Sequence, residues 1–189
     1  MRPSRRMLRP GYVGGTALGH DGRMRLSERL DYPAAPDDVF AMMTDKAFRE
    51  DVCQATGALS WSVEIDPAGT GDDAGASVTV RRVMPAEVPD MVKRLVGETI
   101  EIVQSEQWEP RADGASRHAE LLVEVSGQPA RLLGSATIEP DGTAAVLTVD
   151  GDIKVSIPLV GGKLEKEVAR GVQAGLRVEH RRGLAYLAS

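Results

Sequence analysis

The chain has 189 residues, enough for one domain that buries roughly 70% of its unfolded surface, and too few for two full domains. Hydrophobic residues make up 42% and charged residues 27%, which excludes a largely disordered or membrane-embedded chain. No apolar run approaches the roughly 20 residues of a membrane helix, so we expect no integral membrane segment. The single Cys53 excludes an internal disulfide and a cysteine-built metal site. It suits a reducing compartment, and we expect a cytoplasmic protein.

The net charge of −5 is divided unevenly along the chain. Residues 1–23 carry five Arg and one Asp, whereas residues 24–189 carry 18 basic and 27 acidic residues, a formal charge of −9. An acidic domain offers no basic face, so we expect no nucleic-acid partner. Only seven aromatic residues are present, and a core built from Val, Leu, Ile and Ala leaves room for a cavity.

Residues 1–22 are predicted to be a disordered basic leader that precedes a folded domain over 23–189. Four glycines interrupt every apolar run in this segment, which is unlike a secretory signal. A start codon assigned upstream of Met24 would explain the leader. A basic arm that touches anionic lipid or nucleic acid is the alternative.

The first patterned segment is 24–32, where apolar and polar residues alternate as in a half-buried strand, with Glu28 as a polar exception. The stretch Pro36-Asp37-Asp38 suits the first turn of a helix, and this helical region closes at Gly57. Turns that contain Gly and Asp then separate six consecutive segments with alternating patterns, which predicts antiparallel strands. These strands are expected over 58–66, 76–83, 98–109, 117–125, 131–139 and 144–156.

Two further segments are expected to cover the sheet. Segment 84–97 contains a short amphipathic turn, in which Met91, Leu95 and Val96 would form a lid over the entrance of a cavity or a hydrophobic cap on the sheet edge. Segment 163–187 predicts a helix about 37 Å long. Plotted at 100° per residue, its apolar residues fall on one arc, and Gln173 and His180 fall on the polar side. The apolar arc holds Leu164, Val168, Val172, Gly175, Leu176, Gly183, Tyr186 and Leu187.

This order of elements predicts an α+β fold in which a curved antiparallel sheet of about seven strands grips the long C-terminal helix. Three stretches are more specific: the opening strand followed by 36–40, the strand that ends at Trp108, and 157–165 before the last helix. With them the chain resembles the START and Bet v 1-like (SRPBCC) superfamily, which includes polyketide cyclases and lipid-transfer domains. It looks like a bacterial branch of unknown function. The resemblance implies a helix-grip fold with an internal cavity for apolar or amphipathic small molecules.

Glycines and one acid in the last helix bear on that cavity. Gly175 lies within the apolar arc, where a missing side chain would keep space for a ligand or let the helix sit closer to the sheet. Glu179 lies in the same arc and would be costly to bury alone. It would contact a polar ligand group, be shielded by Arg182, or emerge into solvent at the fraying end of the helix.

Polar residues on the strand that ends at Trp108 are also candidates for lining the expected cavity. Gln104 and Glu106 would face the cavity if Trp108 points inward, unless a bulge after Ile102 exchanges the two faces. Trp61 is a second wall candidate, with core filling as its alternative. The complete candidate ligand-binding set is Trp61, Met91, Leu95, Ile102, Gln104, Glu106, Trp108, Leu121, Val168, Val172, Gly175, Leu176 and Glu179.

The expected function is binding or transport of a hydrophobic or amphipathic small molecule, lipid-like or polyketide-like. No catalytic residue, metal or cofactor is predicted, because the sequence has no Gly-x-Ser-x-Gly elbow, no phosphate-binding loop and no His spacing typical of a metal site. One alternative is a cyclase, aromatase or hydrolase that uses Glu179, Glu106 or Gln104. Another is a partner-binding adaptor whose interface is 84–97. The ligand and the oligomeric state stay open.

Overall fold

The computed structural model describes residues 12–18, 24–69, 75–87, 90–110, 112–157 and 161–189. The strands are β1 (Tyr12–Leu18), β2 (Met24–Tyr32), β3 (Ser60–Ala68), β4 (Gly75–Pro85), β5 (Thr99–Pro110), β6 (Arg117–Val125), β7 (Ala130–Asp141) and β8 (Ala144–Val155). The helices are α1 (Pro36–Met43), α2 (Lys46–Ala55), α3 (Asp90–Val96) and α4 (Gly161–Tyr186).

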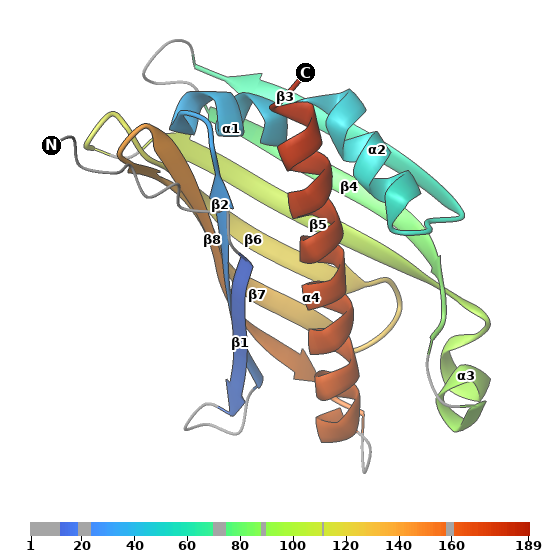
Figure 1. Cartoon of the computed structure of the whole chain (residues 1–189). Coiled ribbons are helices and arrows are strands. Elements are labelled where there is room, and N and C mark those ends of the chain that lie inside the picture. Colours follow the sequence, from blue (N-terminus) through green and yellow to red (C-terminus); the bar gives the residue numbers. More distant parts are fainter. Residues whose placement is uncertain (1–11, 19–23, 70–74, 88–89, 111, 158–160) are drawn as a thin grey trace, which may run out of the picture.

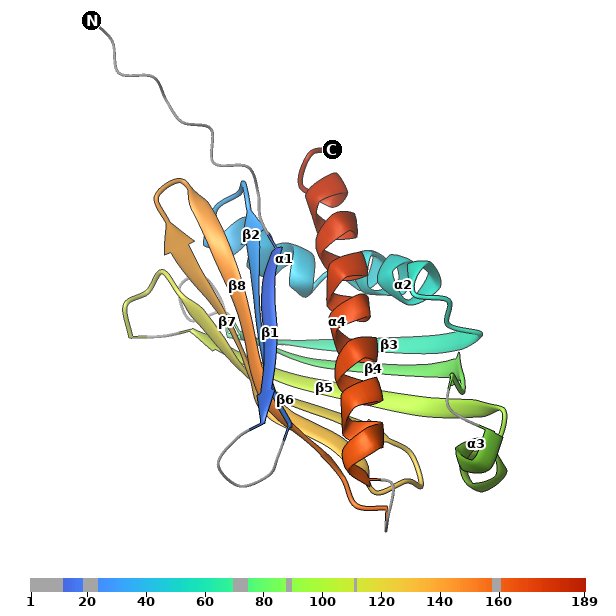
Figure 2. The ribbon, with the colours of Figure 1, turned by 60° about the horizontal axis from the view of Figure 1, so that its bottom comes forward.

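The strands form one curved antiparallel sheet in the order β1-β2-β8-β7-β6-β5-β4-β3. The helices α1, α2 and α4 lie on its concave side, and α4 crosses that side over most of its length (Figures 1 and 2). The predicted α+β arrangement of a curved sheet and a gripping C-terminal helix is confirmed. The sheet has eight strands rather than about seven, because β1 is added next to β2.

The additional strand β1 lies in the segment that was expected to be disordered. It pairs with β2 along its whole length, so its regularity comes from the edge that β2 offers rather than from its own weak apolar pattern. A Cβ at Gly14 would lie 1.6 Å from the Glu28 carboxylate, so only glycine lets the strand pass this buried acid. The expectation of disorder is therefore wrong over Tyr12–Leu18. Residues 1–11 and 19–22 of the leader lie outside the described residues.

Two facing glycines, Gly134 of β7 and Gly151 of β8, allow the sheet to curve strongly. A Cβ on Gly134 would lie 2.0 Å from the Asp150 carbonyl oxygen, and a Cβ on Gly151 would lie 2.9 Å from Leu132 Cδ2. The Asp150 backbone leaves no room for a side chain at Gly134, whereas a side chain at Gly151 would require Leu132 and the Leu133 carbonyl to shift. The curvature gives the helices a concave surface to pack against (Figure 2).

The single helical region expected over 36–57 is divided into α1 and α2. The division falls at Asp45, whose side chain accepts a hydrogen bond of 2.7 Å from the Phe48 backbone nitrogen and caps α2. Both helices bury apolar side chains, among them Phe40 and Met43 of α1 and Val52 of α2. Together they fill one end of the concave face.

The buried face of α4 differs from the predicted arc. Gln173 Nε2 donates to Glu28 Oε1 at 2.7 Å, and His180 Nε2 lies 2.9 Å from the Asp31 carbonyl oxygen. Placing these two residues on the polar side was wrong, because buried acceptors on β2 require polar partners from the helix. A Cβ at Gly183 would lie 2.8 Å from the Tyr32 ring, so this glycine serves close packing.

Candidate functional site

A strip of half-buried residues lies on the concave face of β4, β5 and β6 and on the part of α4 that crosses it (Figure 2). Side chains there are half-buried although they point toward the helix. We term this strip the inner groove; it is lined by Arg82, Ile102, Gln104, Val123, Val172 and Gly175. A Cβ added to Gly175 would meet no atom within 4 Å. The described side chains therefore leave open space at the middle of α4.

Strand register brings these residues to one face. Arg82 of β4 pairs with Ile102 of β5, and Gln104 of β5 pairs with Val123 of β6. Pairing of β4 with β5 runs without interruption past Ile102 to Trp108, so no bulge exchanges the faces of β5. Because side chains alternate along a strand, Ile102, Gln104, Glu106 and Trp108 share the inward face.

A buried ion-pair cluster closes the groove toward α1 and α2. Arg49 of α2 donates to Glu106 Oε2 at 2.5 Å and to Glu179 Oε2 at 3.3 Å, and its Nε donates to the Met43 carbonyl oxygen at 2.7 Å. The side chains of Arg49 and Glu106 are each 3% exposed and that of Glu179 is 10% exposed. Each of these charges is therefore buried against a partner of opposite sign.

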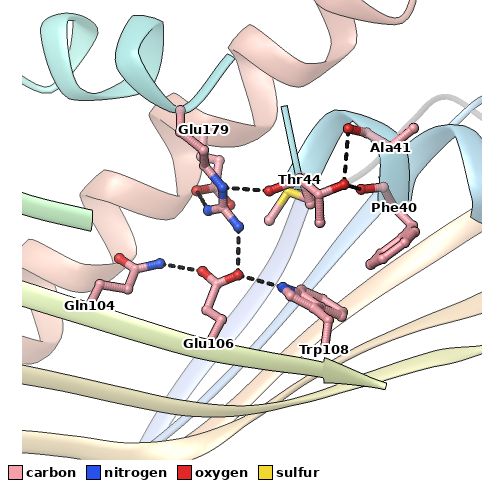
Figure 3. Close-up of polar contacts among 9 residues, drawn as sticks. Phe40, Ala41, Thr44, Gln104, Glu106, Trp108 and Glu179 are labelled. Atoms are coloured by element: carbon pink, nitrogen blue, oxygen red, sulfur yellow. Dashed lines mark hydrogen bonds and ion pairs between the residues drawn. The ribbon is translucent and has the colours of Figure 1, made fainter. Parts of the chain in front are cut away.

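Two neighbours complete what we term the Arg49 cluster: Arg49, Gln104, Glu106, Trp108 and Glu179. Glu106 accepts a hydrogen bond of 2.6 Å from Gln104 Nε2 and one of 2.6 Å from Trp108 Nε1 (Figure 3). Gln104 belongs to both the cluster and the groove, and its carboxamide oxygen points away from Glu106 (Figure 3). The hydrogen bond from Gln104 to Glu106 therefore connects the inner groove to the Arg49 cluster.

Glu106 and Glu179 share one guanidinium in this cluster, and the pKa values of Glu179 and Arg49 lie above their ordinary values. Burial raises the pKa of Glu179; the Arg49 charge opposes this shift and the Glu106 charge adds to it. Burial acts to lower the pKa of Arg49, but Glu106 and Glu179 outweigh it, so the pKa lies above its usual range. Burial and the Glu179 charge also raise the pKa of Tyr32. Its buried hydroxyl has no hydrogen-bond partner among the described residues.

The structure places the predicted site residues in several positions. Half-buried along the inner groove or on the adjacent turns of α4 are Ile102, Gln104, Val168, Val172, Gly175 and Leu176. Buried at its closed end or in the sheet below are Glu106, Trp108, Leu121 and Glu179. Trp61 is 38% exposed at the edge of the same face. Met91 and Leu95 belong to α3, and their side chains lie outside the described residues.

For Glu179, the expectation that the helix end emerges into solvent was wrong. The residue is buried, and it pairs with Arg49 rather than Arg182, which binds Asp51 instead. The physical reason is that α2 packs against this end of α4 and brings a cation with it.

Sequence reasoning missed Arg49 and Arg82. A usable signal existed for the first, because Arg49 shares a helix face with the apolar Val52 and Cys53 at spacings of three and four residues. A cation within an apolar stripe is expected to have a buried acidic partner. Arg82 had a weaker signal, since it continues the inward alternation of Val78 and Val80.

A separate pocket of about 230 Å³ lies around the β6–β7 turn and the end of β8, away from the inner groove. It is lined by Glu124, Gln128, Pro129, Ala130, Arg131, Lys154 and Ser156.

Within the described ranges, no group of three or more His, Cys, Asp and Glu side chains is placed to hold a metal ion. In the same part of the chain, none of the helices combines the length and apolar character needed to cross a membrane.

Residues 27–187 match the model of a family described as Protein of unknown function (DUF2505). Uncharacterized proteins of Mycobacterium bovis and Mycobacterium tuberculosis are 27% identical to this chain over 115 residues. The match covers 59% of this chain and 66% of each relative, so the chain spans just under two thirds of the length of these relatives.

Solved structures share the fold at low sequence identity. Human STARD10 is 12% identical, with 96% of this chain and 72% of that chain covered and a TM-score of 0.57. Human StAR-related lipid transfer protein 5 is 10% identical, covering 96% and 86%, with a TM-score of 0.57. A STAR-related lipid transfer protein from Xanthomonas axonopodis is 16% identical, covering 90% and 98%, with a TM-score of 0.53. The chain therefore has the START-like helix-grip fold.

Proposed function

Since this chain belongs to the DUF2505 family, whose function is unknown, we propose a function from its geometry: it binds or transports a hydrophobic or amphipathic small molecule in the inner groove. The observation that carries the proposal is the open space at Gly175. A glycine inside a helix costs about 1 kcal/mol relative to alanine, and close packing does not explain this one. A bound molecule that needs the space does explain it.

The lining of the groove supports the same proposal. Ile102, Val123 and Val172 offer apolar surface, and Gln104 adds a polar group, which is the usual composition of a small-molecule site. The proteins of the same fold named above as lipid transfer proteins lend further support. Because their identity to this chain is low, the ligand class rests on the groove itself.

The cyclase, aromatase or hydrolase alternative requires a free acid or base that faces the groove. Both oxygens of Glu106 accept hydrogen bonds, and one oxygen of Glu179 pairs with Arg49. These contacts favour a supporting role for the cluster over a chemical one. The adaptor alternative depends on 84–97, where the side chains of Met91 and Leu95 lie outside the described residues.

Two matched variants of α4 test the binding proposal. Gly175→Leu fills the open space, whereas Gly171→Leu adds the same side chain at an exposed position that also meets no atom within 4 Å. Both variants are expected to gain about 0.5–1 kcal/mol of stability from helix propensity. Only Gly175→Leu is expected to lose binding of a fluorescent fatty-acid probe, 11-(dansylamino)undecanoic acid, measured by titration of the full chain.

Native mass spectrometry of protein purified from its own host, followed by lipid extraction, would identify a resident ligand. Equal probe binding by Gly175→Leu and Gly171→Leu would refute the inner groove as the site. Absence of both probe binding and co-purified small molecules would refute the binding function.

A further inference from the structure

Arg82 is a cation on the concave face at the open side of the inner groove. It lies in one cross-strand row with Trp61 of β3 and Ile102 of β5, and Ile102 pairs in turn with Val125 of β6. The inward-facing residues that precede it on β4, Val78 and Val80, are buried in the core. Arg82 itself is half-buried. Its side chain therefore lies under the helices and is still reached by solvent.

The surroundings of Arg82 place its charge between α2 and α4. Burial raises the pKa of Cys53 in α2, while the charge of Arg82 and a hydrogen bond from it act in the opposite direction. The same charge opposes the raised pKa of Glu179 in α4. Arg82 thus faces the two helices that border the groove.

Arg82 differs from the buried arginines in how its charge is balanced. Arg49 binds the carboxylates of Glu106 and Glu179, and Arg117 binds Asp37 at 3.0 Å. No carboxylate of the described residues forms an ion pair with Arg82. A guanidinium carries five N–H donors, and the thiol of Cys53 is a weak acceptor. Most of its donors are therefore available to a ligand.

We propose that Arg82 binds the anionic head group of an amphiphile whose apolar tail lies over Ile102, Val123 and Val125. The proposal deepens the proposed function by naming its ligand class, and it rests on that function. A guanidinium fork fits a carboxylate or a phosphate in a bidentate manner. In a partly desolvated site such a contact contributes about tenfold or more to affinity. The apolar row beside Arg82 accepts the hydrocarbon chain.

The experiment compares ligands of equal chain length that differ only in the head group. The full chain is titrated by calorimetry with dodecanoate, dodecyl phosphate and dodecanol, each below the concentration at which it forms micelles. We expect at least one of the two anions to bind about tenfold more tightly than dodecanol. The tighter of the two anions identifies the head group as carboxylate or phosphate.

Variants at the neighbouring residues Arg81 and Arg82 test whether Arg82 causes the preference for anions over dodecanol. Arg82→Gln is expected to weaken anion binding about tenfold and to leave dodecanol binding within about twofold of wild type. Arg81→Gln, at an exposed position on the opposite face of β4, is expected to change neither. Arg82→Lys keeps the charge and is expected to retain part of the anion preference, which covers the case that Arg82→Gln fails to fold.

The outcomes separate this inference from the function on which it rests. Equal affinity of the wild-type chain for the anions and dodecanol would overturn the anionic ligand class and leave the binding function standing. An anion preference that persists in folded Arg82→Gln would overturn the role of Arg82. No binding of any of the three molecules would overturn both.

Discussion

Removing the Arg49 guanidinium is the sharpest test of the buried cluster. In Arg49→Met the apolar stem is kept, but Glu106 and Glu179 lose their shared cation while both stay buried. Removal of one partner of a buried ion pair costs about 3–5 kcal/mol, and here two carboxylates and the Met43 carbonyl are left without their donor. We therefore expect a loss of stability at the upper end of that range near neutral pH.

Urea unfolding followed by circular dichroism measures this loss, and lowering the pH tests its cause. Protonation relieves an unpaired carboxylate, so the deficit of Arg49→Met is expected to shrink as the pH falls toward about 4.5. The triple variant with Glu106→Gln and Glu179→Gln is expected to recover much of the loss. Arg170→Met is the control, since its pair with Glu167 is exposed and contributes about 0.5 kcal/mol or less. A deficit below about 1 kcal/mol, or one that is the same at both pH values, would refute the electrostatic reasoning.

Three further changes test separate parts of the structure. Because burial raises the pKa of Glu179, its contribution to stability is complete below the unfolded pKa of about 4.3 and is lost as the pH rises through the folded pKa. The stability of Glu179→Gln relative to that of wild type should therefore rise as the pH is raised from about 4 through the folded pKa, and urea midpoints that shift in parallel would contradict this. Gly183→Ala forces a methyl group against the Tyr32 ring and should be less stable than wild type despite better helix propensity, by about 1–2 kcal/mol in thermal unfolding. Asp45→Ala removes the cap of α2 and should cost about 1 kcal/mol, checked by the same melt; an unchanged melting temperature would show that the Phe48 hydrogen bond contributes nothing.

Local patterns predicted most of the fold, because alternation and helical spacing are properties of short segments. The strand over Met24–Tyr32 follows from such a pattern, whereas the inward face of β5 stayed open until the uninterrupted β4–β5 pairing excluded a bulge. The strand β1 was missed because its pairing comes from β2, and the sequence YVGGTAL carries little apolar alternation of its own. The division of α1 from α2 depends on a single capping side chain, which periodicity does not detect.

The site was predictable only in part, because its parts lie far apart in the chain. Glu106 and Glu179 were identified as acids in apolar patterns, and each required a partner that local spacing does not identify. Arg49 is 57 residues from the first and 130 from the second. Its place beside Val52 and Cys53 on one helix face indicates burial, but only the packing of α2 against α4 shows which acids it pairs with.

The facing pair Gly134 and Gly151 separates the curvature of the sheet from the side chains that line the inner groove. At Gly134 main chain lies against main chain, so this close approach does not depend on which side chains line the inner groove. Residues such as Ile102, Val123 and Val172 can then change while the sheet keeps its curvature. Substitutions along the inner groove would therefore leave the curvature of the sheet in place, as long as position 134 keeps no side chain.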